Sequence, residues 1–223
     1  MTLTFVEDTH EYRLDGEVIP SVTEILKPLT ETQYNAIPPD VLRIAAERGT
    51  DVHAACEAID YELTPEIEYP DIIGYIAAYE QFLYDHAVEW YGIEEMGACT
   101  TWPIDFAGTV DRWGEVDGCF SIVDIKTTQS PSIEQKVSVC LQTFMYASII
   151  SEKHDVTFAK RYALFLKKDG DYSLLDCGEF EGKEGILLFS MADDLISLWK
   201  QKQDAQKIVR TIKERHRRKK KDE

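Results

Sequence analysis

Two aspartates and a lysine, Asp111, Asp124 and Lys126, stand in a pattern that favours metal-dependent phosphate chemistry. Residues two apart in a β-strand point to the same face, so Asp124 and Lys126 are expected to project together. Asp111 ends the preceding strand of the expected hairpin, which brings the two carboxylates side by side. Converging carboxylates repel unless a cation lies between them, and hard oxygen ligands suit Mg²⁺ or Mn²⁺. An ammonium beside that ion can orient a water and stabilise developing phosphoryl charge. The alternative for the same residues is a surface hairpin with an i,i+2 salt bridge.

The second half of the chain must position these groups, and its pattern alternates strands with helices. Apolar alternation and turn residues predict strands over 106–113 and 119–126, joined at Asp117-Gly118. The elements expected beyond them are a helix over 132–150, strands over 158–166 and 172–177 that turn at Asp169-Gly170, and a long helix from about Gly182.

The first half reads as a hairpin followed by helices. Short β-prone runs at 3–6 and 11–14 precede the turn Asp15-Gly16 and the residues Val18 and Ile19. Ser21-Val22-Thr23-Glu24 matches a capping box and predicts a short helix that Pro28 stops. Helices are expected over 41–63 and 71–90. The fold class is therefore α/β: a mixed sheet flanked by helices in one domain, 1–223. That domain comprises an N-terminal hairpin and helical lobe (1–91), a sheet core (92–181) and a C-terminal helix with a basic tail (182–223).

The charge of the chain, −17, is unevenly distributed. Residues 200–223 carry 11 Lys and Arg against 4 Asp and Glu, whereas the remaining 199 residues carry 13 basic and 37 acidic side chains. An acidic body does not bind nucleic acid by bulk charge, so a phosphate site must be local, built from cations or the tail. The tail, Lys213 to Lys221, either attracts phosphate or is a solvated helix end whose cations face the negative helix terminus.

The composition limits location and cofactors. The amino-terminal residues show no basic and apolar run of the kind found in signal peptides, and apolar stretches are too short for a membrane span. The five cysteines are widely spaced and include no CxxC pair. We therefore expect a reduced, cytoplasmic protein of a bacterial host or phage, with no membrane association and no iron–sulfur cluster.

Several segments together resemble one known family. Gly108-Thr109-Val110-Asp111-Arg112, then Val123-Asp124-Ile125-Lys126-Thr127-Thr128, then Gln142 and Tyr146 on a helix are similar to the nuclease motif of the PD-(D/E)XK superfamily. The RecB-like and phage-exonuclease branch is the most similar. Glu47-Arg48-Gly49-Thr50-Asp51-Val52-His53 resembles the RGxxxH helix of that branch, and Pro20-Ser21-Val22-Thr23-Glu24-Ile25-Leu26 resembles the start of phage-borne members. The resemblance covers residues 5 to 165 in patches and implies a restriction-endonuclease-like core.

The resemblance also implies a role for each matching residue. Asp111, Asp124, the backbone carbonyl of Ile125 and His53 would bind Mg²⁺, for which Mn²⁺ would substitute. Lys126 would position the attacking water, and Gln142 and Tyr146, four apart on one helix face, would steady the lysine or the nucleic-acid backbone.

Other residues keep two readings each. Glu94 and Glu95 are each a candidate for an extra acidic ligand on the strand before the hairpin, and the sequence decides neither which of them it is nor whether either joins the site. Arg48 contacts a phosphate or pairs with a carboxylate, and Trp102 and Trp113 either stack on bases or belong to the core or rim.

The function expected from the resemblance is a Mg²⁺-dependent DNA exonuclease of phage or prophage recombination or repair. Its partners would be DNA and a single-strand annealing recombinase. The alternatives are an endonuclease with the same site, or a catalytically silent nucleic-acid-binding or scaffold protein on the same fold. The sequence leaves polarity, strand preference and oligomeric state open.

Overall fold

The structure is a computed structural model and has a mixed α/β fold, as the sequence predicts. It describes residues 1–34, 37–178 and 183–222, apart from the side chains at 32–34, 184, 215, 216 and 218–222. The elements, in chain order, are β1 (Leu3–Val6), η1 (Glu7–Thr9), β2 (Glu11–Leu14), β3 (Glu17–Ile19), α1 (Val22–Tyr34), α2 (Pro39–Asp60), η2 (Pro70–Ile72), α3 (Ile73–Asp85), β4 (Val88–Cys99), β5 (Phe106–Val116), β6 (Cys119–Thr127), α4 (Ile133–His154), β7 (Lys160–Leu166), β8 (Tyr172–Asp176) and α5 (Lys183–Asp222).

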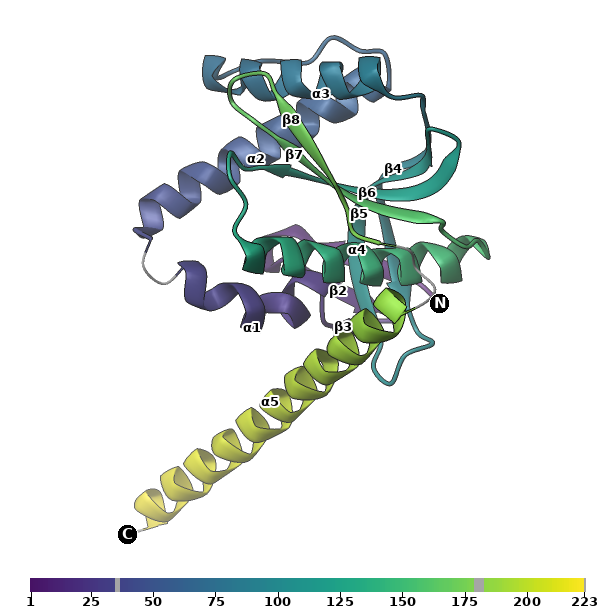
Figure 1. The fold of residues 1–223 in the computed structure, drawn as a ribbon. Coiled ribbons are helices and arrows are strands. Elements are labelled where there is room, and N and C mark those ends of the chain that lie inside the picture. The colour runs from purple at the N-terminus through teal and green to yellow at the C-terminus, as the bar shows by residue number, and fades with distance from the viewer. Residues whose placement is uncertain (35–36, 179–182, 223) are drawn as a thin grey trace.

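A five-stranded sheet in the order β4-β5-β6-β7-β8 forms the centre of the fold (Figure 1). All its pairings are antiparallel except that of β6 with β7, which is parallel. A parallel pair needs a crossover connection, and α4 supplies it. The crossover fixes the carboxyl end of β6, where Lys126 lies, beside the start of α4.

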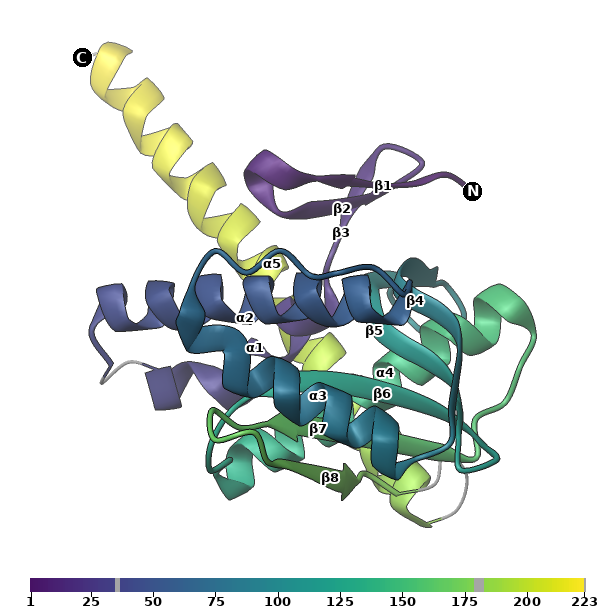
Figure 2. The same ribbon diagram turned by 90° about the horizontal axis from the view of Figure 1, so that it is seen from above.

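The helices cover both faces of this sheet, so the helices of residues 1–91 do not form a separate layer. One face packs against α1, α4 and the first part of α5, with Val22, Ile25 and Met145 buried there. The other packs against α2 and α3, with Val52 and Tyr79 buried there. Seen from above, α2 and α3 lie across the sheet (Figure 2).

A second, three-stranded antiparallel sheet, β1-β2-β3, lies against the outer end of the β4–β5 hairpin. Tyr12 and Leu14 pack there on Ala107, and a parallel bridge between Ser21 and Ala107 connects the end of β3 to β5. The Tyr12 hydroxyl lies 2.9 Å from the Thr109 hydroxyl. This small sheet therefore supports the strand that carries Asp111 two residues further on.

Two boundaries predicted from the sequence are wrong. The helix that Pro28 was expected to stop continues to Tyr34. Pro28 lies on the exposed side of α1, and the burial of Ile25 and Leu26 against the core offsets the cost of a proline inside the helix. The helix predicted to reach Trp90 ends at Asp85, and β4 starts at Val88, because this segment pairs with β5.

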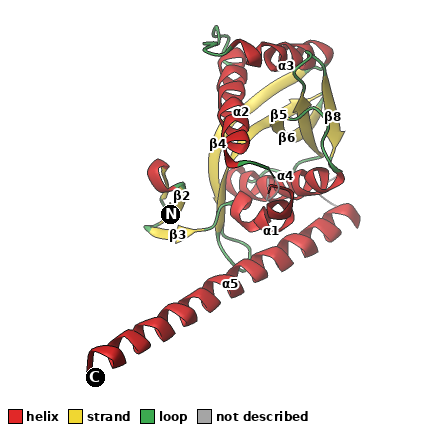
Figure 3. Cartoon of the chain, turned by 90° about the vertical axis from the view of Figure 1, so that its left-hand side faces the viewer, coloured by secondary structure: helices red, strands yellow, loops and turns green. Residues whose placement is uncertain are grey.

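The last helix, α5, is 40 residues long and extends away from the sheet (Figure 3). Its predicted start at Gly182 lies outside the described residues. Its first part is held by Ala192 and Ile196, which are buried against α4 and α1. Among the described residues, every helix is too short or too polar to cross a membrane.

Candidate metal centre

The candidate site lies where β5 and β6 separate. The two strands pair from Val116↔Cys119 to Arg112↔Val123, after which β6 continues only with β7. Asp111 and Asp124, the next residue on each strand, therefore lie opposite each other at the point of separation. The Ile125 N–H donates to Oδ2 of Asp111 at 2.7 Å, so a carboxylate takes the place of a main-chain partner. The local geometry thereby fixes Asp111.

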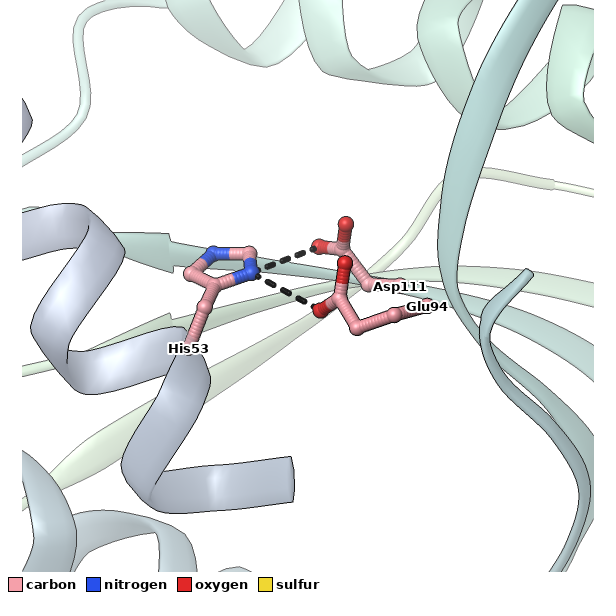
Figure 4. A group of neighbouring side chains, drawn as sticks. All are labelled: His53, Glu94 and Asp111. Carbon is pink, nitrogen blue, oxygen red and sulfur yellow. Dashed lines mark hydrogen bonds and ion pairs between the residues drawn. The ribbon is translucent and has the colours of Figure 1, made fainter. Parts of the chain in front are cut away.

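Three side chains from three elements converge beside this point: His53 from α2, Glu94 from β4 and Asp111 from β5 (Figure 4). One potential ligand atom of each lies within 4.8 Å of those of the others. Nδ1 of His53 is 3.3 Å from Oε1 of Glu94 and 3.9 Å from Oδ2 of Asp111. On the other side of the ring, Nε2 of His53 is 3.1 Å from the Ile125 carbonyl oxygen. The predicted His53, Asp111 and Ile125 thus lie together.

The electrostatics of the cluster favour a cation. Burial lowers the pKa of His53, but the carboxylates of Asp111 and Glu94 outweigh burial and raise that pKa to about 9. For Glu94, burial acts to raise the pKa, but the contacts with His53 and Arg112 outweigh burial, so the pKa of Glu94 is lowered. Glu94 therefore stays ionised near neutral pH, and its carboxylate attracts positive charge to the space that it shares with His53 and Asp111.

Glu94, not Glu95, is the acidic residue of β4 that joins the site. Glu95 accepts hydrogen bonds from Nε1 of Trp113 at 2.6 Å and is ion-paired with Lys153 and His154. Glu94 has a φ of 46° and follows a register shift between Trp90 and Gly92. A left-handed conformation costs a non-glycine residue about 1–2 kcal/mol, and here it accompanies a carboxylate turned toward His53.

Asp124 and Lys126 form an ion pair beside the cluster. Asp124 is fully buried, and Nζ of Lys126 lies 2.7 Å from its Oδ2 and 3.0 Å from its Oδ1. Burial, opposed by Lys126 and assisted by the neighbouring Asp111, raises the pKa of Asp124 to about 6. The shared face predicted for these two residues is confirmed. Their pairing leaves Asp124 outside the group formed by His53, Glu94 and Asp111, so its role as a direct ligand stays a prediction.

Gln142 and Tyr146 lie on one face of α4, as their spacing predicts. Nε2 of Gln142 donates to the Tyr146 hydroxyl at 2.9 Å, and both side chains are buried. The Tyr146 ring lies so close to β5 that a Cβ at Gly108 would come within 2.7 Å of it. Gly108 therefore allows α4 to bring this pair next to the strand of Asp111.

Sequence reasoning missed a buried network behind Glu94. Nε of Arg112 donates to Oδ2 of Asp60 at 2.5 Å, and Nη1 of Arg112 contacts Oε1 of Glu94 at 3.2 Å. Asp60 also accepts from the Tyr79 hydroxyl at 2.7 Å and from Nε1 of Trp90 at 3.1 Å. Arg112 and Asp60 are 52 residues apart, so no local pattern could have paired them.

Arg48, Trp102 and Trp113 contact aromatic or core residues of the protein. The guanidinium of Arg48 lies 5.6 Å from the ring centroid of Tyr75. Trp113 is a core residue with 6% of its surface exposed, and Trp102 packs against the same core. The core reading of both tryptophans is confirmed. In the tail, the backbone is helical to Asp222, but the side chains at 215, 216 and 218–222 lie outside the described residues.

The donor set suits a hard divalent cation. It comprises Nδ1 of His53 and the carboxylates of Glu94 and Asp111, a mixture compatible with Mg²⁺ and Mn²⁺, while the Ile125 carbonyl lies at Nε2 on the other side of the ring. Bound there, the cation would displace the proton of His53, because a histidine ligand must be neutral.

Comparisons with known proteins leave the family open. Neither a scan against models of protein families nor a search of curated proteins finds a match. Among solved structures, the chain is similar to one described as the crystal structure of SSO0001, with 18% identity over 78% of this chain and 84% of that chain, at a TM-score of 0.30. Such a score does not establish a shared fold, so function must be inferred from the site itself.

Proposed function

We propose that this chain is a metal-dependent deoxyribonuclease of the PD-(D/E)XK type that hydrolyses DNA phosphodiester bonds as an exonuclease. The observation that carries the proposal is the convergence of His53, Glu94 and Asp111 beside the Ile125 carbonyl. Lys126, the next residue of β6, is ion-paired with Asp124 beside this group. A surface hairpin with one salt bridge would not require a histidine from α2 and a glutamate from β4.

Each residue has a defined task in this reaction. When bound, a divalent cation would lower the pKa of a coordinated water and neutralise charge on the scissile phosphate. The ammonium of Lys126 lies beside the site and stabilises the negative charge that develops on the phosphoryl oxygens. Asp124 keeps that ammonium in place through the ion pair. Gln142, held by its hydrogen bond to the buried Tyr146, faces the α4 side and steadies the strand being cut.

The decisive experiment uses end-labelled linear DNA and covalently closed circular DNA, with Mg²⁺ or with EDTA. We expect cleavage of linear DNA in Mg²⁺ and none in EDTA. The test variant is Lys126→Ala, and its matched control is Lys160→Ala, because Lys160 lies in the same sheet and also pairs with an aspartate, Asp176, at 2.8 Å. The proposal fails if the purified chain cleaves neither DNA, or if Lys126→Ala retains the rate of Lys160→Ala. Cleavage of the circle would identify the endonuclease alternative.

Cytoplasmic location, a role in phage recombination and cooperation with a single-strand annealing recombinase belong to the same proposal. They depend on the nuclease assignment and would be tested by co-purification after that activity is established.

A further inference from the structure

A cavity of about 310 Å³ opens next to Lys126, on the α4 side of the sheet. It lies between α1, the end of β6 and α4, and α1 and α4 run beside each other there (Figure 1). The residues that line it are Thr23, Leu26, Thr30, Lys126, Thr127, Thr128, Gln135, Ser138, Val139, Gln142 and Phe165.

The lining combines an apolar base with a polar rim. Leu26, Val139 and Phe165 are each 3% exposed and form the apolar part. Hydroxyl and amide groups supply donors and acceptors around it, and Lys126 supplies the positive charge. Among the described residues that line the cavity, none is acidic, although the chain as a whole carries −17. An apolar cavity with a few polar groups and one cation suits a flat, polar-edged ring attached to an anion.

Two residues that line the cavity also contact residues beside the candidate metal centre. Lys126 borders the cavity and is also ion-paired with Asp124 beside the metal cluster. Gln142 borders the cavity and donates to Tyr146, which approaches the strand of Asp111. A group bound in the cavity is therefore next to the phosphate that Lys126 would contact.

We propose that this cavity receives the base of one unpaired nucleotide, so that the substrate of the proposed nuclease is a DNA strand with an unpaired end. Its volume is at the lower limit of ligand sites, which begin at about 300 Å³, and this is too small for a base pair. A base in a duplex would have to leave its stack to enter, whereas an unpaired base enters without that cost. The proposal rests on the nuclease function and adds the form of its substrate.

The test fills the cavity from two different helices. Ser138→Leu, on α4, and Thr30→Leu, on α1, each add a larger apolar side chain to the lining. Ser197→Leu, at an exposed position on α5, is the control for the same substitution. Thermal unfolding and Mn²⁺ titration of each variant show whether the fold and the metal centre are retained. Cleavage is then measured on a single strand, a blunt duplex and a duplex with an unpaired overhang, and affinity for each DNA is measured in EDTA.

We expect the wild-type chain to prefer unpaired ends over blunt ends by about tenfold or more, because unstacking opposes entry of a paired base. Both cavity variants should lose about tenfold or more in kcat/KM and affinity for the single strand, whereas Ser197→Leu should match wild type. Equal single-strand affinity in a folded cavity variant and in Ser197→Leu would overturn the inference, as would a preference for blunt duplex. If no DNA is cleaved but the cavity variants lose single-strand affinity, the cavity assignment stands and the nuclease proposal fails.

Discussion

The buried ion pair between Arg112 and Asp60 gives a sharp prediction for the variant Asp60→Asn. The two side chains are 0% and 1% exposed, and Nε of Arg112 donates to Oδ2 of Asp60. Asparagine presents an NH₂ group in place of one carboxylate oxygen, and that group cannot accept from Arg112. Removing one charge of a buried pair costs about 3–5 kcal/mol, and Arg112 would keep only the partly exposed Glu94 as a nearby carboxylate. The loss is a large share of the roughly 5–15 kcal/mol by which domains are stable.

The same substitution should lower the affinity of the candidate metal centre for Mn²⁺, although Asp60 is not one of its ligands. Arg112 divides its contacts between Asp60 and Glu94, so loss of Asp60 leaves Glu94 as the carboxylate nearest to the guanidinium. A stronger ion pair between Arg112 and Glu94 makes the Glu94 carboxylate less available to bind a metal ion. Loss of a residue that orients a ligand commonly costs about 10–100-fold in metal affinity, and we expect a decrease of that size for Mn²⁺.

The assay combines urea unfolding with Mn²⁺ titration. The control is Glu47→Gln, which breaks the exposed pair between Arg43 and Glu47, whose side chains are 63% and 60% exposed. An exposed i,i+4 pair contributes about 0.3–0.5 kcal/mol, so this control should unfold close to wild type. If Asp60→Asn and Glu47→Gln show the same urea midpoint and the same Mn²⁺ affinity, the reasoning about burial and about Arg112 is refuted.

Three further outcomes are expected. Lys126→Ala should lower the cleavage rate by about 10²–10³-fold while Mn²⁺ still binds, and a rate near wild type would contradict its role. Mn²⁺ affinity should rise by about tenfold per pH unit up to pH 9 and then level off, because the ion must displace the proton of His53, whose pKa is raised to about 9. The variant His53→Ala should bind Mn²⁺ more weakly and lose this pH dependence. The control His86→Ala, which removes an ion pair with Asp117 elsewhere, should keep the pH dependence. Deleting the residues after Lys213 removes six positive and three negative charges. The deletion should weaken DNA binding and make the affinity less dependent on salt concentration, with little change in the maximal cleavage rate. An unchanged salt dependence would show that the tail does not contact DNA.

The sequence predicted the strands and the helix around the candidate site well because their signals are local. The hairpin of β5 and β6, its turn at Asp117-Gly118 and the face shared by Asp124 and Lys126 follow from alternation over a few residues. The i,i+4 pair Gln142 and Tyr146 follows from helix periodicity in the same way. Strand and helix periods are read directly from the chain, so these features needed no knowledge of tertiary contacts.

The parts that were missed depend on contacts between distant segments. The start of β4 was read as helix because its pairing with β5, and not its own residues, makes it a strand. The choice of Glu94 over Glu95 depends on the register shift and the left-handed φ of Glu94. Such a conformation in a glutamate is imposed by tertiary structure and has no propensity signal.

The hydrogen bond between the Ile125 N–H and the Asp111 carboxylate has a spectroscopic consequence. The Ile125 N–H donates to Oδ2 of Asp111 across an N···O distance of 2.7 Å, and the carbonyl oxygen of the same residue lies 3.1 Å from Nε2 of His53. A cation bound by Asp111 withdraws electron density from that carboxylate and weakens the bond to the amide. In ¹⁵N-labelled protein, the single Ile125 resonance should therefore move as the centre fills, and its position gives the fractional occupancy directly. Metal binding thus becomes measurable at one backbone atom, in the absence of DNA and of any turnover.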